Sequence, residues 1–81
     1  MEHKPDYILD FRGSISSISL LKMTRTFKEM KARQTMEILG SDPDMRHDIF
    51  RVLPESSYDV LLVDETEDGD GYYRVQIRKR K

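Results

Sequence analysis

Four stretches of the chain have the apolar pattern of β-strands. Residues 7–11, 58–64 and 72–79 alternate apolar and polar positions, as half-buried strands do, and residues 35–39 form a shorter apolar run. The last two strands are separated by an acidic loop with two glycines, residues 65–71, which favours an antiparallel hairpin. With this alternation, the side chains of the hairpin that face the core are those of Tyr58, Val60, Leu62, Tyr73, Val75 and Ile77.

Two other stretches have the spacing of amphipathic helices. Residues 17–31 place an apolar residue at every third or fourth position, and Ser16 or Ser17 suits the N-cap of this helix. Asp42 can cap a second helix, Pro43 fits its first position, and the next proline along the chain ends it. The inward stripes are Leu20, Met23, Phe27 and Met30 in the first helix, and Met45, Ile49 and Val52 or Leu53 in the second.

The predicted order of elements is β-α-β-α-β-β. Both helical stripes are buried most simply in an α/β (α+β) two-layer sandwich, in which two helices cover one face of a four-stranded mixed sheet. The chain has 81 residues, so we expect a single domain over residues 1–81 with one apolar layer. A domain of this size leaves little room for an enclosed substrate cavity.

Composition and charge narrow the function classes. Charged residues make up 36% of the chain and hydrophobic residues 37%, which is polar but sufficient for folding. No apolar run approaches the roughly 20 residues of a membrane span, and residues 1–6 are too polar for a signal peptide. We therefore expect a cytoplasmic protein without membrane contact. The net charge of −1 hides a basic helix face and a basic chain end, which favours selective docking over bulk nucleic-acid binding.

Few residues of the chain are of types that catalyse reactions or bind metal ions. The chain contains no cysteine, which excludes disulfides, thiolate metal sites and cysteine nucleophiles. His3 and His47 are far apart in sequence, and no base stands near the serines at residues 14–19, which suit helix capping. We therefore predict no metal, no cofactor and no enzymatic activity.

Two segments resemble the TusA/SirA-like sulfur-carrier family. Residues 10–19 read Asp-Phe-Arg-Gly-Ser-Ile-Ser-Ser-Ile-Ser, where the family has Asp-x-Arg-Gly-x-x-Cys-Pro-x-Pro. Residues 42–49 read Asp-Pro-Asp-Met-Arg-His-Asp-Ile, where the family has Asp-Pro and then a helix with Asp-Ile. The resemblance covers nearly the whole chain and implies the same β-α-β-α-β-β order. The matching positions are Asp10, Arg12, Gly13, Asp42, Pro43, Asp48 and Ile49.

The chain departs from the family pattern at its central residue. Ser16 falls where the family has its sulfur-carrying cysteine, and Ser17 and Ser19 fall where it has prolines. Because a serine hydroxyl cannot hold persulfide sulfur, the resemblance implies a non-catalytic protein-binding or regulatory module that has lost sulfur carriage. Two alternatives stay open. One is a true carrier, serving tRNA thiolation or sulfur metabolism, seen as a Cys-to-Ser variant; the other is an RNA-binding domain, because the family's fold resembles the C-terminal domain of translation initiation factor three.

The expected partner is a protein, either a sulfurtransferase or another component of a sulfur relay, and RNA is less favoured. The sequence indicates no oligomeric state. A competing docking surface is the face of the sheet without helices, where the predicted strand phases gather Ile8, Leu39, Leu61, Val63 and Tyr72. The residues predicted to bind the partner are Asp10, Arg12, Gly13, Ser16, Ser17, Lys22, Arg25, Asp42 and Pro43.

Overall fold

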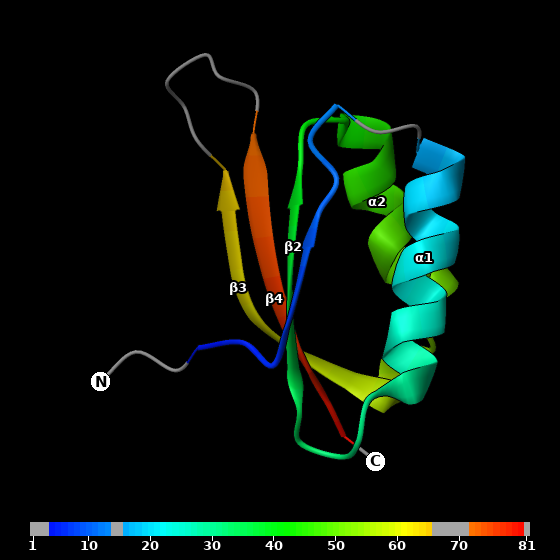
Figure 1. The fold of residues 1–81 in the computed structure, drawn as a ribbon, viewed down its shortest axis with the longest axis vertical. Helices are drawn as coiled ribbons and strands as arrows, with labels where there is room; N and C mark the ends of the chain where they lie inside the picture. The colour runs from blue at the N-terminus through cyan, green and yellow to red at the C-terminus, as the bar shows by residue number, and fades with distance from the viewer. Residues whose placement is uncertain (1–3, 14–15, 66–71, 81) are drawn as a thin grey trace.

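The chain folds in the predicted order of strands and helices (Figure 1). A computed structural model describes residues 4–13, 16–65 and 72–80. The acidic loop between the last two strands lies outside the described residues except for its first residue. The elements are β1 (Tyr7–Asp10), α1 (Ser16–Glu29), β2 (Thr35–Gly40), α2 (Pro43–Val52), a 3-10 turn (Glu55–Ser57), β3 (Tyr58–Glu65) and β4 (Tyr73–Lys79).

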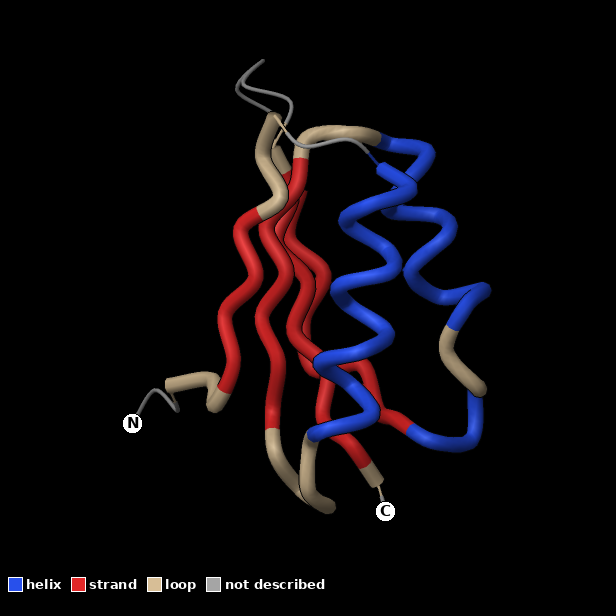
Figure 2. Tube along the Cα trace, turned by 45° about the vertical axis from the view of Figure 1, so that its right-hand side comes forward, coloured by secondary structure: helices blue, strands red, loops and turns tan. Residues whose placement is uncertain are grey.

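The four strands form one mixed sheet, in the order β1-β2-β4-β3. The β1–β2 pair is parallel, and the β2–β4 and β4–β3 pairs are antiparallel. Both helices lie on the same side of the sheet, which leaves the other side uncovered (Figure 2). This arrangement confirms the predicted two-layer architecture. We call the uncovered side the open face.

The core is the single layer between the sheet and the helices. Met23 of α1, Ile49 of α2, and Met36 and Ile38 of β2 are all fully buried. Tyr58 closes one end of this layer, where its ring meets Phe27 edge-on with the centroids 6.4 Å apart. Both predicted helical stripes therefore face inward. The other buried apolar residues are Leu9, Phe11, Phe27, Met30, Met45, Leu53, Tyr58, Tyr73, Val75 and Ile77.

The predicted phase of β3 is correct only at its beginning. The register with β4 shifts between Val60 and Leu62, so that Leu62 pairs with Gln76 and Val63 pairs with Val75. An extra residue in one strand reverses the facing of all side chains beyond it. Leu62 therefore points to the open face and Val63 to the helix side, opposite to the prediction. Val60 faces the helix side as predicted but stays 48% exposed on this edge strand.

The open face is charged rather than apolar. Across its middle, the Gln76 side-chain amide donates a hydrogen bond to Glu37 at 2.8 Å, and Arg74 pairs with Asp64 at 3.5 Å. Of the five apolar residues predicted to gather there, Ile8 and Leu61 are exposed among these charges, and Val63 lies on the other side of the sheet. The prediction is therefore wrong for Val63, whereas Ile8 and Leu39 lie on this face as predicted, opposite the charged residues Glu37 and Arg74.

The C-terminal end of α1 is capped by a side chain from β4. The Lys79 ammonium donates to the backbone carbonyls of Phe27 and Met30, at 2.8 Å each. It also lies 5.0 Å from the centroid of the Phe27 ring. The last carbonyls of a helix lack partners within the helix and carry partial negative charge, so this cation satisfies both needs. Lys79 thereby ties the end of α1 to the sheet.

Candidate functional site

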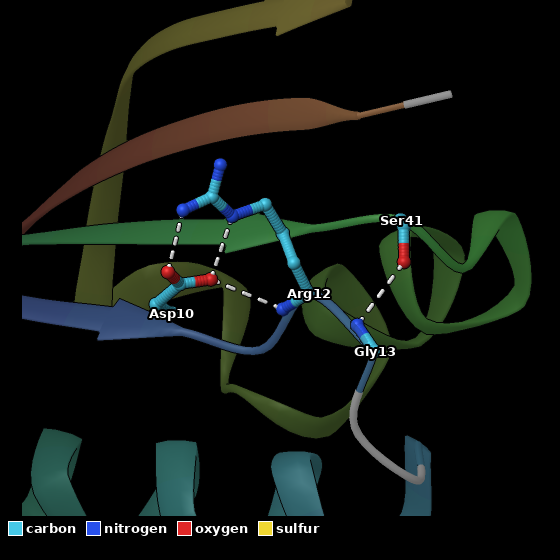
Figure 3. A network of polar contacts seen from close by, with 4 residues as sticks. All are labelled: Asp10, Arg12, Gly13 and Ser41. Carbon is cyan, nitrogen blue, oxygen red and sulfur yellow. Dashed lines mark hydrogen bonds and ion pairs between the residues drawn. The ribbon is translucent and has the colours of Figure 1, made fainter. Parts of the chain in front are cut away.

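The turn that follows β1 is organised by one ion pair. The Arg12 guanidinium donates two hydrogen bonds to the Asp10 carboxylate, at 2.9 and 2.7 Å, and the Arg12 backbone N–H donates a third at 3.1 Å (Figure 3). These bonds lower the pKa of Asp10 to about 2 and raise the pKa of Arg12. Both side chains are about half exposed, so the pair contributes little to stability. Its effect is to hold a cation in one orientation at the surface.

Gly13 makes the turn from the strand toward α1. Its φ of 79° lies in the left-handed region, which side chains other than glycine rarely adopt. No neighbouring atom lies within 4 Å of where a Cβ would stand, so the backbone angle and not space requires glycine. The Gly13 N–H makes a long contact of 3.5 Å with the Ser41 hydroxyl oxygen (Figure 3). The β1–α1 turn therefore lies beside the β2–α2 turn.

The β2–α2 turn confirms the predicted start of α2. The helix begins at Pro43, and the Asp42 carbonyl accepts the first helical hydrogen bond from the Arg46 N–H at 3.2 Å. The negative charge of Asp42 also contributes, after burial, to raising the pKa of Tyr73 to about 12. Asp42 and Pro43 thus lie at the same end of the sheet as Arg12.

Tyr72, the residue just before β4, completes the site. The Arg12 guanidinium lies over the ring of Tyr72, 5.4 Å from its centroid. Tyr72 is 43% exposed. Arginine and tyrosine are frequent anchors of protein interfaces because each combines a large flat surface with hydrogen-bonding groups. The predicted strand phases place Tyr72 on the open face, and no pattern in the sequence connects it with Arg12.

The start of α1 is rich in serine. The helix begins at Ser16, so Ser16 and Ser17 lie in its first turn. Helix ends are defined only to within one or two residues, so the predicted capping by Ser16 or Ser17 stays a prediction. Ser17 is exposed. Ser19 is buried, and its hydroxyl has no hydrogen-bond partner among the described residues.

The outer side of α1 combines cations with exposed apolar residues. Lys22 and Arg25 are exposed, as predicted, and no described carboxylate forms an ion pair with either. Ile18 and Leu21 are also exposed, at 62% and 61%. Sequence reasoning missed this apolar pair, although the inward stripe of α1 already placed both residues on the opposite side. We call Ile18, Leu21, Lys22 and Arg25 the helix face.

The structure brings most of the predicted site residues to one end of the molecule. Asp10, Arg12 and Gly13 lie beside the turn that contains Ser41, Asp42 and Pro43. Arg25 is not part of this cluster, because it is nine residues along α1 from Ser16, which corresponds to about 14 Å. In the described part of the chain, no group of three histidine or acidic side chains is placed to hold a metal ion. None of the described helices is long and apolar enough to cross a membrane.

Comparison with known proteins gives the family to which this fold and these two turns belong. The profile of the family described as "Sulfurtransferase TusA" matches residues 7–79, which is most of the chain, and the chain belongs to this family. A protein of Archaeoglobus fulgidus described as a "Putative sulfur carrier protein" is 28% identical over 74 residues, which cover 91% of this chain and 97% of that protein. The present chain is a TusA-family member that contains no cysteine.

Proposed function

We propose that this protein is a cytoplasmic, non-catalytic binding module that docks onto a protein of a sulfur relay and carries no sulfur itself. The proposal rests on one observation: the residues of the β1–α1 turn that match the family are present, but the family's cysteine is absent. Asp10 holds Arg12 in a fixed orientation, and Gly13 keeps its left-handed turn. The chain nevertheless contains no cysteine.

Sulfur carriage needs a thiolate. A carrier thiolate attacks the outer sulfur of a donor persulfide, forms a new sulfur–sulfur bond and releases the donor thiolate. The serine hydroxyl at position 16 offers no thiolate and no sulfur atom to form that bond. A module of this kind can still occupy the docking site of a true carrier, and in doing so it would regulate the relay.

The helix face has the chemistry of a docking surface. The exposed side chains of Ile18 and Leu21 offer an apolar centre, and Lys22 and Arg25 offer a cationic rim. Protein interfaces commonly combine an apolar centre with a polar rim, and the charged rim steers association. The complementary partner surface is an apolar depression bordered by acidic residues. Arg12 and Tyr72 add an anchor at the β1–α1 turn.

The first prediction concerns sulfur loading. Incubated with a cysteine desulfurase and cysteine, the protein is expected to gain no mass of about one sulfur atom, because it has no thiol to form a persulfide. Intact-mass spectrometry measures this, with a cysteine-bearing TusA-family protein as the positive control. A stable addition that a reductant removes would contradict the proposal.

The Ser16→Cys variant is the matched comparison in this assay. It restores a thiol in the first turn of α1, but Ser17 and Ser19 remain where the family has prolines. Proline in the first helical turn pre-sets the backbone that aims N–H groups at the sulfur. We therefore expect this variant to load more slowly than the cysteine-bearing control protein. Loading at an equal rate would show that the two serines are neutral.

The second prediction concerns the helix face. Arg25→Glu is expected to slow association with a cysteine desulfurase about fivefold at low salt and to weaken the salt dependence of association, because rim charges act mainly on encounter. The free energy of unfolding should change by less than about 0.5 kcal/mol, since Arg25 is exposed. Biolayer interferometry at several salt concentrations measures the rates.

Arg51→Glu is the control for this charge reversal. Arg51 is also exposed, but it lies near the end of α2, outside the helix face. Its reversal should leave the association rate within about twofold of the original. If Leu61→Asp abolishes binding while Arg25→Glu changes neither the rate nor its salt dependence, the docking site is on the open face and the helix-face proposal fails.

A further inference from the structure

A groove of about 710 Å³ lies on the open face of the sheet. It is located where β1 and β2 begin and β4 ends. The start of β2 and the end of β4 are in the lower part of the view in Figure 1. The Asp10–Arg12 turn is at the opposite end of β1, about 13 Å away along the strand. The groove is therefore separate from the candidate site described above, and α1 and α2 lie on the other side of the sheet.

Cationic side chains dominate the lining of this groove. Lys4, Arg33, Arg78 and Arg80 contribute four positive charges, against the two carboxylates of Asp6 and Asp59. Lys79 also borders the groove, but its ammonium is directed to the carbonyls at the end of α1. The groove is thus positive on a chain whose net charge is −1.

Asp59 pairs with two arginines, Arg78 of β4 and Arg80 just after this strand, and cannot neutralise both. Its carboxylate accepts a hydrogen bond from the Arg80 side chain at 2.8 Å and pairs with Arg78 at 3.4 Å. These contacts hold the pKa of Asp59 below its usual value. One carboxylate shared by two guanidinium groups leaves one positive charge in excess, together with N–H donors on both arginines. Arginine N–H groups arranged in this way suit the oxygens of phosphate groups.

Arg33 enters the groove from a strained backbone. Its φ of 73° makes it the non-glycine residue with a left-handed conformation in the described part of the chain. The Arg33 N–H donates to the Lys79 carbonyl at 2.7 Å, which fixes the turn against the end of β4. Glycine would adopt this conformation without strain. Strained residues are concentrated at functional sites, and here the strained residue adds a cation to the groove.

We propose that this groove binds consecutive phosphate groups of a polyanion. The groove is open and polar, which fits a charged chain along the surface better than an enclosed apolar ligand. The Arg78 and Arg80 pair and the Arg33 side chain reach it from different segments, so neighbouring phosphates are contacted from several directions. The phosphates belong either to a free polyphosphate group or to an RNA backbone. This inference does not depend on the proposed docking function.

Two probes distinguish these sources. One is a fluorescein-labelled oligouridylate of about ten nucleotides, followed by fluorescence anisotropy, and the other is inorganic tripolyphosphate, followed by the NMR shifts of backbone amides. The Arg78→Ala/Arg80→Ala double variant should weaken binding of the accepted probe at least about tenfold. For the oligonucleotide it should also reduce the slope of log affinity against log salt by about 1, since exposed phosphate contacts release counterions.

A charge-matched control excludes general electrostatic attraction. The Lys28→Ala/Arg51→Ala variant removes the same amount of charge from the exposed side of the two helices and should leave the affinity within about twofold. Arg33→Gly should weaken binding about threefold while raising the melting temperature by about 3 °C, because it removes a cation and the backbone strain together. The proposal is overturned if neither probe binds, if the two double variants weaken binding equally, or if Arg33→Gly leaves binding unchanged.

Discussion

Gly40→Ala is expected to destabilise the protein by about 3 kcal/mol, the largest effect of any small substitution that we expect here. Gly40 ends β2 and pairs with Tyr73 of β4. A Cβ on Gly40 would overlap the phenol end of the Tyr73 ring and would lie 2.9 Å from its carbon Cε1. Tyr73 is only 5% exposed, so its ring can avoid the overlap only by leaving the core. Thermal unfolding should show a melting temperature lower by about 15 °C.

A double-mutant cycle with Tyr73 tests this cause. In a Tyr73→Leu background the ring is gone, and adding Gly40→Ala should cost less than about 1 kcal/mol. In a Tyr73→Phe background the ring remains, so Gly40→Ala should stay severe. Tyr73→Phe alone should be nearly neutral, because the buried Tyr73 hydroxyl has no hydrogen-bond partner among the described residues. An equal cost of Gly40→Ala in the Leu and Phe backgrounds would show that the ring is not the obstacle.

Lys79→Met is expected to destabilise the protein by about 2 kcal/mol. The substitution keeps most of the aliphatic length but removes the ammonium that donates to the carbonyls of Phe27 and Met30. Hydrogen bonds from a charged donor contribute more than neutral ones, and the lost cation also faced the negative end of α1. Urea unfolding followed by circular dichroism gives the free energy.

Lys28→Met is the matched control for this cap. Lys28 is also a lysine in the last turn of α1, but its side chain is exposed. It can act on the helix end only through charge, so its removal should cost about 0.3 kcal/mol. If both variants lose the same free energy, the Lys79 hydrogen bonds contribute nothing beyond their charge.

Periodicity was sufficient to predict the fold. Only one arrangement buries the apolar stripes of α1 and α2 together with the inward side chains of β1 and β4. That arrangement is two helices on one face of a sheet. The phase of β3 could not be predicted in the same way. Alternation counted from Tyr58 predicts that Val60 and Leu62 face inward, but residues 60–63 are all apolar, so the pattern does not show where that alternation is interrupted. A bulge leaves no mark in composition. Pairing with β4 decides it.

The candidate site was predictable only where short-range rules apply. Gly13 and Pro43 have backbone requirements that follow from residue type, and both lie where the sequence placed them. The Arg12–Tyr72 contact joins residues sixty positions apart, and no local pattern indicates such a pairing. The ion pairs of the open face escaped prediction for a related reason, since they depend on which strands are neighbours. The groove is built from the same kind of long-range placement.

The position of β1 has a further consequence for how the site behaves. β1 is a four-residue edge strand that is paired only with β2, whereas β2 and β4 are each flanked on both sides. Local opening starts where the fewest contacts must break, but Leu9 of β1 and Phe11 just after it are buried in the core, so β1 opens only when these two side chains leave the core. The Asp10–Arg12–Gly13 turn is carried at the end of this strand. A partner that reshapes this turn must therefore also displace core side chains, whereas a partner that binds the turn as it stands does not.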